Sequence, residues 1–251
     1  MQLGSLESHW FKGGFSEAYL APRLPLTFRW LANFVQTYIE RDIWALGYEL
    51  SDPLLTKLLT MISHVNGNMI NVSDLSRSLG VSQPTVNRYL DLLEGIFVLN
   101  RLPPYAANVG KRLVRTPKVY LRDSGLLHQL AKVADYDALL GHPVVGASWE
   151  GYVIEQIRRV VGTDWSFFYY RTAAGAEIDV LLIAPNGKKV AVEITFSNAP
   201  TVSKGFYLSL ADTKPDAAFV VIPTGDSYLK AENIWVTNLT DFLTNRLAVF
   251  H

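Results

Sequence analysis

Residues 175–197 contain two mainly apolar runs, one on each side of Pro185-Asn186-Gly187. Polar side chains alternate with apolar ones in parts of both runs. Two such runs joined by an Asn-Gly turn predict a β-hairpin. Side chains alternate along a strand, so Glu193 faces away from its neighbour Val192. If the hairpin is centred on Asn186, Asp179 of the first run lies directly opposite Glu193 of the second.

Helical periods dominate the N-terminal part of the chain. Apolar residues recur as one stripe along residues 28–39, and Asp52-Pro53 begins a second helix because proline suits the first helical position. A short helix from Ser73 to Gly80 and another from Ser82 to Gly95 follow, and a strand begins at Ile96. Helix, glycine turn, helix and strand in this order are typical of a winged helix-turn-helix.

Helices and strands alternate in the rest of the chain. The predicted elements are a strand at 118–121, a helix capped by Asp123 and Ser124, a helix at 146–160, a strand at 165–170, the hairpin, a helix at 204–210, strands at 217–222 and 234–236, and a helix at 240–247. The order from residue 146 is α-β-β-β-α-β. The predicted fold class is therefore α/β (α+β), with a helical lead-in at 1–50, a winged helix-turn-helix at 51–130 and an α/β domain at 131–251.

Charge and composition narrow the class of protein. The 23 basic side chains balance the 23 acidic ones, which argues against a chain that coats nucleic acid non-specifically. Residues 101–122 nevertheless carry six lysines and arginines and no acid. The chain has no cysteine and no apolar run of membrane length, and no signal peptide is visible at its N-terminus. We expect a cytoplasmic protein without a membrane partner.

Asp179 and Glu193 bring two carboxylates to facing positions among valine and isoleucine neighbours, where they repel each other. A divalent cation, Mg²⁺ or Mn²⁺, would remove this penalty because it takes carboxylate oxygens as ligands. A salt bridge would remove it as well, since Glu177 and Asp179 could pair with Arg171 or Lys189 on an adjacent strand. The residues alone leave both arrangements open.

The hairpin resembles the site of the PD-(D/E)xK nuclease-like superfamily, in which an acid on one strand and an E-x-K on the next hold a metal beside the scissile phosphate. The matching acids are Asp179 and Glu193, and Glu150 lies on the preceding helix, where the superfamily often places another acid. The lysine position carries Thr195 instead. The resemblance therefore implies a degenerate catalytic site of Glu150, Asp179, Glu193 and Thr195, with Asp179 and Glu193 as the metal ligands.

Three other cations, Lys188, Lys189 and Arg171, could reach the position of the missing lysine. A general acid–base group contributes about 10²–10⁴-fold to a rate, so a chain without a well-placed lysine would cleave weakly. The ordinary interpretation of Glu150 is a solvated helix face.

Two polar surfaces are candidates for nucleic acid contact. The second helix of the winged-helix segment would enter the major groove, and the basic loop at 101–118 would act as a wing on phosphate. The candidate residues are Gln83, Thr85, Asn87 and Arg88 on the helix and Lys111, Arg112 and Arg115 on the loop. The same helices could instead form only a packing module or a protein-docking platform.

The chain as a whole resembles the domain of unknown function found C-terminal to an AAA+-type ATPase module in many prokaryotic proteins. The blocks that carry the resemblance include WFKGGFSEAYLA, YIERDI, HPVVGASWEGYVIEQI, YYRTAAGAEIDVLL and VAVEITFS. The resemblance implies a P-loop ATPase N-terminal to this chain, with the junction near Lys12-Gly13-Gly14. ATP would bind only through that missing module, because the Gly110-Lys111-Arg112 loop lacks the spaced glycine and the Ser or Thr of a Walker A motif.

Together, these observations predict the C-terminal, DNA-associated region of an AAA+-type ATPase, with a nuclease-like fold and a degenerate metal site. One alternative is a weakly active Mg-dependent nuclease, and another is a protein-interaction module without nucleic acid contact. The expected partners are DNA and the ATPase module of the same parent protein. The rest of the chain or a second copy, forming a homo-oligomer, would cover the apolar stripe at 28–39.

Overall fold

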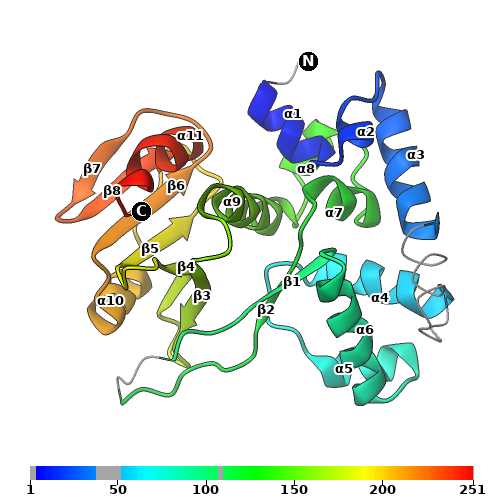
Figure 1. The fold of residues 1–251 in the computed structure, drawn as a ribbon, viewed down its shortest axis with the longest axis horizontal. Helices are drawn as coiled ribbons and strands as arrows, with labels where there is room; N and C mark the ends of the chain where they lie inside the picture. The colour runs from blue at the N-terminus through cyan, green and yellow to red at the C-terminus, as the bar shows by residue number, and fades with distance from the viewer. Residues whose placement is uncertain (1–3, 38–51, 107–109, 251) are drawn as a thin grey trace. The chain divides into compact units, whose positions relative to one another are not determined.

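The structure is a computed structural model that describes residues 4–37, 52–106 and 110–250 (Figure 1). It confirms the mixed α/β class, with helices and two sheets. The chain forms two compact units, Met1–Arg101 with Val119–Tyr152, and Leu102–Lys118 with Val153–His251. Within the described ranges no helix is long and apolar enough to cross a membrane.

The first unit is mainly helical. Its helices are α1 (Ser5–Lys12), α2 (Ser16–Tyr19), α3 (Leu24–Phe34), α4 (Asp52–His64), α5 (Val72–Leu79), α6 (Gln83–Gly95), α7 (Ser124–Leu130), α8 (Tyr136–Leu140) and the beginning of α9 (Val145–Val161). Two short strands, β1 (Leu99–Leu102) and β2 (Lys118–Leu121), pair with each other where the chain passes between the units.

The helices predicted at 73–80 and 82–95 form, as α5 and α6. Gly80 ends α5 in the left-handed conformation, φ 71°, which glycine adopts without strain. The Ser82 hydroxyl caps α6 by accepting a hydrogen bond from the Thr85 N–H at 3.3 Å. Residues of one face of α6, including Val86 and Leu93, are buried. The strand that follows begins at Leu99 and not at Ile96.

Glycines hold the N-terminal segment against α7. The Gly14 N–H donates to the Asp123 carboxylate at 2.7 Å, and the same carboxylate caps α7 through the Leu126 N–H. At Gly125 a β-carbon would lie 2.0 Å from the Lys12 carbonyl oxygen. The Lys12-Gly13-Gly14 motif thus has a packing role inside the first unit, because only residues without a side chain allow this approach.

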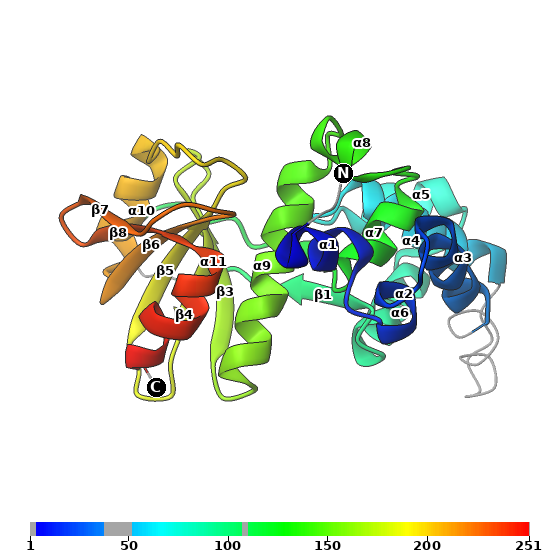
Figure 2. The same cartoon turned by 90° about the horizontal axis from the view of Figure 1, so that it is seen from above.

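The second unit is built on a six-stranded mixed sheet with the strand order β3-β4-β5-β6-β8-β7 (Figure 2). Strands β5, β6 and β8 run parallel, and the remaining neighbours are antiparallel. Its elements are β3 (Ser166–Arg171), β4 (Glu177–Ile183), β5 (Lys189–Ile194), α10 (Lys204–Thr213), β6 (Ala217–Ile222), β7 (Tyr228–Ala231), β8 (Ile234–Asn238), α11 (Leu239–Asp241), the π-helix Phe242–Arg246 and the 3-10 helix Ala248–Phe250.

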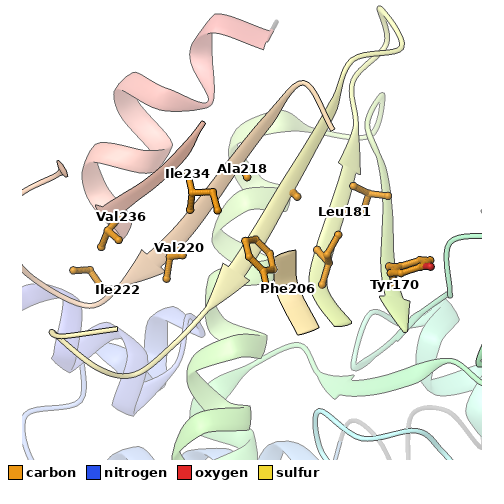
Figure 3. Close-up of a cluster of buried hydrophobic side chains, with 10 residues drawn as sticks. Tyr170, Leu181, Phe206, Ala218, Val220, Ile222, Ile234 and Val236 are labelled. Carbon is orange, nitrogen blue, oxygen red and sulfur yellow. The ribbon is translucent and has the colours of Figure 1, made fainter. Parts of the chain in front are cut away.

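Helices cover both faces of this sheet. Phe206 of α10 inserts into a buried cluster with Leu181, Val220 and Val236 on one face (Figure 3). On the other face, the Phe219 ring lies 5.2 Å from the ring of Phe242. Burial of apolar surface on both sides explains why the strands are almost continuously hydrophobic.

Two features differ from the sequence predictions. The edge strand β7 was not expected, because its side chains are mostly exposed. The two units also divide the chain differently from the predicted segments 1–50, 51–130 and 131–251, since each unit contains two separate stretches. The end of the predicted stripe, at residues 38 and 39, lies outside the described residues.

Candidate functional site

The β4–β5 hairpin has the predicted register. Val180 pairs with Val192 and Leu181 with Ala191, and the turn closes through the Gly187 N–H on the Ala184 carbonyl at 2.8 Å. Continued by one residue, this register sets Asp179 opposite Glu193. Local turn chemistry therefore suffices to bring the two acids to adjacent strands.

A β-bulge changes the course of β4 at the first of these acids. Phe168 pairs with Leu181 and Tyr170 with Ile178, so Asp179 and Val180 together oppose the single residue Tyr169. Asp179 Oδ2 accepts a hydrogen bond from the Ile194 N–H at 2.9 Å. Bulges redirect side chains and are common beside functional sites, and here the bulge coincides with an acid whose carboxylate is bonded to the neighbouring strand.

Lys118 supplies the cation of this site. It comes from β2 and is only 4% exposed. Its Nζ lies 2.8 Å from Glu177 Oε1, 3.6 Å from Asp179 Oδ1 and 5.7 Å from the centre of the Tyr169 ring. Arg171 pairs with the second oxygen of Glu177 at 3.2 Å. Glu177 and Asp179 are thus balanced by salt bridges, and the pair of Arg171 with Glu177 is one that the sequence allowed.

Residues 102–118, here called the strap, bring Lys118 to the carboxylates. The Tyr105 N–H donates to the Tyr169 carbonyl at 2.7 Å, and the Val114 N–H donates to the Arg171 carbonyl at 3.0 Å. The strap therefore covers the edge of β3 with backbone hydrogen bonds, as an added strand would. The strap is part of the second unit, although its basic residues predicted a wing of the helical segment.

Two tyrosines of β3 form hydrogen bonds with the strap and with α10. The Tyr169 hydroxyl donates to the Thr116 carbonyl, and burial raises the pKa of Tyr169 although Lys118 opposes the shift. The Tyr170 hydroxyl donates to Asp212 at 2.9 Å, and burial together with this bond raises the pKa of Tyr170. Lys111 of the strap binds the same Asp212 at 2.6 Å. Both hydroxyls thus remain protonated donors.

The donor set does not suit a divalent cation as it is arranged. Asp179 presents one oxygen to a backbone N–H and the other to the Lys118 ammonium. In the part of the chain that the structure describes, no group of three or more His, Asp or Glu side chains is placed to hold a metal ion. Magnesium favours several oxygen ligands without a competing ammonium.

The other predicted site residues have the following positions. Glu193 is half-buried and pairs in register with Val220, and the Thr195 N–H donates to the Val221 carbonyl at 3.1 Å. Glu150 belongs to the first unit, where it is half-buried and accepts a hydrogen bond from the Tyr120 hydroxyl. It is therefore not simply a solvated helix face.

Of the three cations proposed to replace the missing lysine, Arg171 pairs with Glu177 within the site, and the two lysines have other partners. Lys189 donates to the Thr213 carbonyl, and Lys188 lies 5.8 Å from the centre of the Phe250 ring. Sequence reasoning missed Lys118 as a site residue. Its signal was a lysine within an otherwise apolar strand, KVYL, because a buried lysine requires a partner of opposite charge.

The predicted nucleic-acid-binding residues are divided between the two units. Gln83, Asn87 and Arg88 are exposed on α6, whereas Thr85 is half-buried and its hydroxyl bonds that of Ser82 at 2.9 Å. The remaining candidates, Lys111, Arg112 and Arg115, are exposed on the strap. Their contact with nucleic acid stays a prediction.

Comparisons with known proteins identify relatives over most of the chain. Residues 3–137 match the model described as a domain of unknown function (DUF8612), and residues 145–242 match a second domain of unknown function (DUF4143). The chain is also similar to an uncharacterized protein of Mycobacterium bovis and one of Mycobacterium tuberculosis, each 35% identical over 214 residues. The matches cover 85% of this chain and 48% of each relative, so the chain spans about half the length of the curated relatives it matches.

Proposed function

Since the chain belongs to the domain-of-unknown-function family DUF8612, we propose a function for it from its site. It is the C-terminal, DNA-associated region of an AAA+-type ATPase, with a winged helix-turn-helix and a PD-(D/E)xK nuclease-like fold. In its degenerate metal site, the Lys118 ammonium takes the place of a metal ion. The fold acts as a binding platform and not as an enzyme.

The element order supports the nuclease-like part of this proposal. From α9 the elements run α9-β3-β4-β5-α10-β6, the α-β-β-β-α-β order predicted for that fold. Asp179 and Glu193 occupy facing ends of β4 and β5, where the superfamily carries its acids.

The observation that carries the proposal is the position of Lys118. The buried Lys118 ammonium lies 2.8 Å from Glu177 and 3.6 Å from Asp179, and it neutralises the repulsion between these two carboxylates. A metal ion in this site would have to compete with Lys118 for one oxygen of Asp179, and the positive charge of the lysine would repel it. The carboxylates of Glu177 and Asp179 therefore need no metal ion, as expected for a site that has a structural role and no catalytic one.

Metal binding to a Lys118→Met variant tests this role. Methionine keeps much of the apolar volume and removes the charge, so we expect calorimetry to detect Mg²⁺ or Mn²⁺ binding by the variant and none by the wild-type chain at millimolar metal. Adding Asp179→Asn should abolish the new binding. Lys111→Met is the matched control, since Lys111 is a strap lysine whose partner is Asp212.

Two results would contradict the platform role. Wild-type chain that binds Mn²⁺ and cleaves DNA, with cleavage lost in Lys118→Met, would establish the weakly active nuclease, with Lys118 as its displaced lysine. Failure of every variant to bind metal would mean that Lys118 is not what keeps a metal out.

DNA association is supported by the exposed polar face of α6. Arg88 and Asn87 lie beside each other on a capped helix that follows a glycine turn. We expect Asn87→Ala with Arg88→Gln to weaken duplex DNA binding about tenfold, the usual loss for base-edge contacts. Arg77→Gln on α5 is the control, because Arg77 is exposed and paired with Asp74. No binding at low salt would favour the protein-interaction module.

The association with an ATPase is supported by the comparisons. DUF4143 is commonly associated with AAA ATPases, and about half of each relative lies outside the matched region. Any ATP site would then belong to the accompanying module. The corresponding test is whether a protein containing both parts hydrolyses ATP while this chain alone does not.

A further inference from the structure

A cavity of about 980 Å³ opens along the strap. Its lining combines aliphatic and aromatic surface with cations, including Tyr105, Leu113, Val114, Lys111, Arg112 and Arg115. This volume lies at the upper end of the range for small-molecule sites, about 300–1,000 Å³. A ligand of that size with both a flat apolar part and negative charge would match the lining.

The apolar side of the cavity is held in place by the core. Tyr105 and Leu113 are partly buried and pack against the hydrophobic cluster under α10. The Tyr105 ring meets the Phe168 ring edge-on at 5.7 Å. An aromatic ring fixed in this way can act as a stacking surface, and stacking tolerates any base because every base has a π-face.

The basic side is fixed by the sheet. The Ala173 N–H donates to the Arg112 carbonyl at 2.8 Å, and Leu113 forms a β-bridge with Thr172. Arg112 and Arg115 therefore stand on backbone anchored to the end of β3, with both side chains exposed. Lys111, in contrast, is paired with Asp212. The two arginines are therefore the main groups of this cavity that could bind the phosphates of a ligand.

We infer that this cavity binds single-stranded nucleic acid, with a base against Tyr105 and phosphates on Arg112 and Arg115. The inference rests on the proposed DNA association and assigns it a substrate class. A base within a duplex is paired and stacked, so only an unpaired base can leave the strand and lie on an aromatic side chain. The strap would thus read single strands, while α6 faces duplex DNA.

Fluorescence anisotropy with a thymidine oligonucleotide of about 12 nucleotides, within the usual site size of such proteins, tests the inference on the whole chain. We expect Arg112→Gln with Arg115→Gln to weaken single-strand binding at least tenfold and to lower the salt slope by about 1.4, or about 0.7 for each phosphate. Tyr105→Leu should weaken binding roughly tenfold through lost stacking. Tyr105→Leu, which lies outside the residues predicted to contact duplex DNA, should leave duplex binding unchanged, because a paired and stacked base cannot reach this ring.

Arg159→Gln is the matched charge control, because Arg159 is an exposed arginine of the same unit outside the cavity. Arg112→Lys with Arg115→Lys should retain most of the affinity and guards against a folding defect. Single-strand binding unchanged by the strap variants would overturn the inference. If Asn87→Ala with Arg88→Gln still weakened duplex binding, the proposed function would survive that failure; absence of all nucleic acid binding would remove both.

Discussion

His128 illustrates how one buried residue links the stability of the first unit to pH. Its Nδ1 lies 2.9 Å from the Phe11 carbonyl, which can only accept, so Nδ1 carries the proton. Its Nε2 then accepts from the Ser148 hydroxyl at 2.7 Å, and Ser148 in turn accepts from the Trp10 indole at 2.9 Å. Burial lowers the pKa of His128 to about 4, which keeps the imidazole neutral in the folded chain.

Acid should therefore weaken the fold through this residue. Below pH 6.5, the approximate pKa of His128 in the unfolded chain, the unfolded chain binds a proton on this imidazole, whereas the folded chain does not. The free energy of unfolding therefore falls as the pH drops toward 4. Between about pH 7.5 and pH 5 we expect a loss of about 2 kcal/mol, measured by urea unfolding. Asparagine at this position cannot titrate, but its amide can still donate to the Phe11 carbonyl. The free energy of unfolding of His128→Asn should therefore fall by about 2 kcal/mol less than that of the wild type over this pH range. Equal pH dependence of both proteins would contradict the assignment.

At the scale of elements, local signals and long-range contacts contribute differently. Caps and turns predicted α5, α6, α7 and the β4–β5 hairpin because Gly80, Ser82, Asp123 and Asn186-Gly187 act on their immediate neighbours. Strand β7 could not be predicted, since its exposed residues carry no alternation and it exists only by pairing with β8. The α1–α7 contact could not be predicted either, because it depends on the close approach of Gly125 to the Lys12 carbonyl, which is far away in the sequence.

Gly125→Ala should disrupt this helix contact. The added methyl would sit 2.0 Å from the Lys12 carbonyl oxygen, and overpacking of this kind costs about 1–3 kcal/mol or somewhat more. Gly146→Ala is the matched control: Gly146 is a helical glycine of α9 with nothing within 4 Å of the added carbon, so alanine should stabilise by about 0.5–1 kcal/mol. Urea unfolding of both variants checks the signs. A Gly125→Ala chain as stable as the wild type would show that α1 can move away.

At the scale of the whole molecule, each unit is assembled from two separate stretches. The strap leaves the helical part after Arg101 and returns to it at Val119, and α9 crosses the boundary at Tyr152. A cut near residue 130 would therefore remove the strap from the sheet. Such a cut would uncover the N–H and C=O groups of Tyr169 that bond residues 103 and 105, and it would take away Lys118.

A fragment of residues 131–251 should consequently associate through its uncovered β3 edge, because exposed edges pair with other strands. We expect size-exclusion chromatography to show oligomers, and a peptide of residues 102–118 to restore a monomer by strand addition. The same peptide with Tyr105→Pro, which lacks the N–H for Tyr169, should be less effective. A monomeric fragment with the unfolding temperature of the whole chain would refute this dependence on the strap.

The sequence by itself determined the fold class, most helices and strands, and the hairpin register that sets Asp179 opposite Glu193, because caps, turns and apolar periods act over a few residues. Only the tertiary structure decided what balances Glu177 and Asp179. Lys118 is remote in sequence and reaches Glu177 and Asp179 because backbone hydrogen bonds lay the strap along β3. A lysine in an apolar strand indicates that some acid must pair with it, but a long-range pairing leaves no local signal of which acid that is.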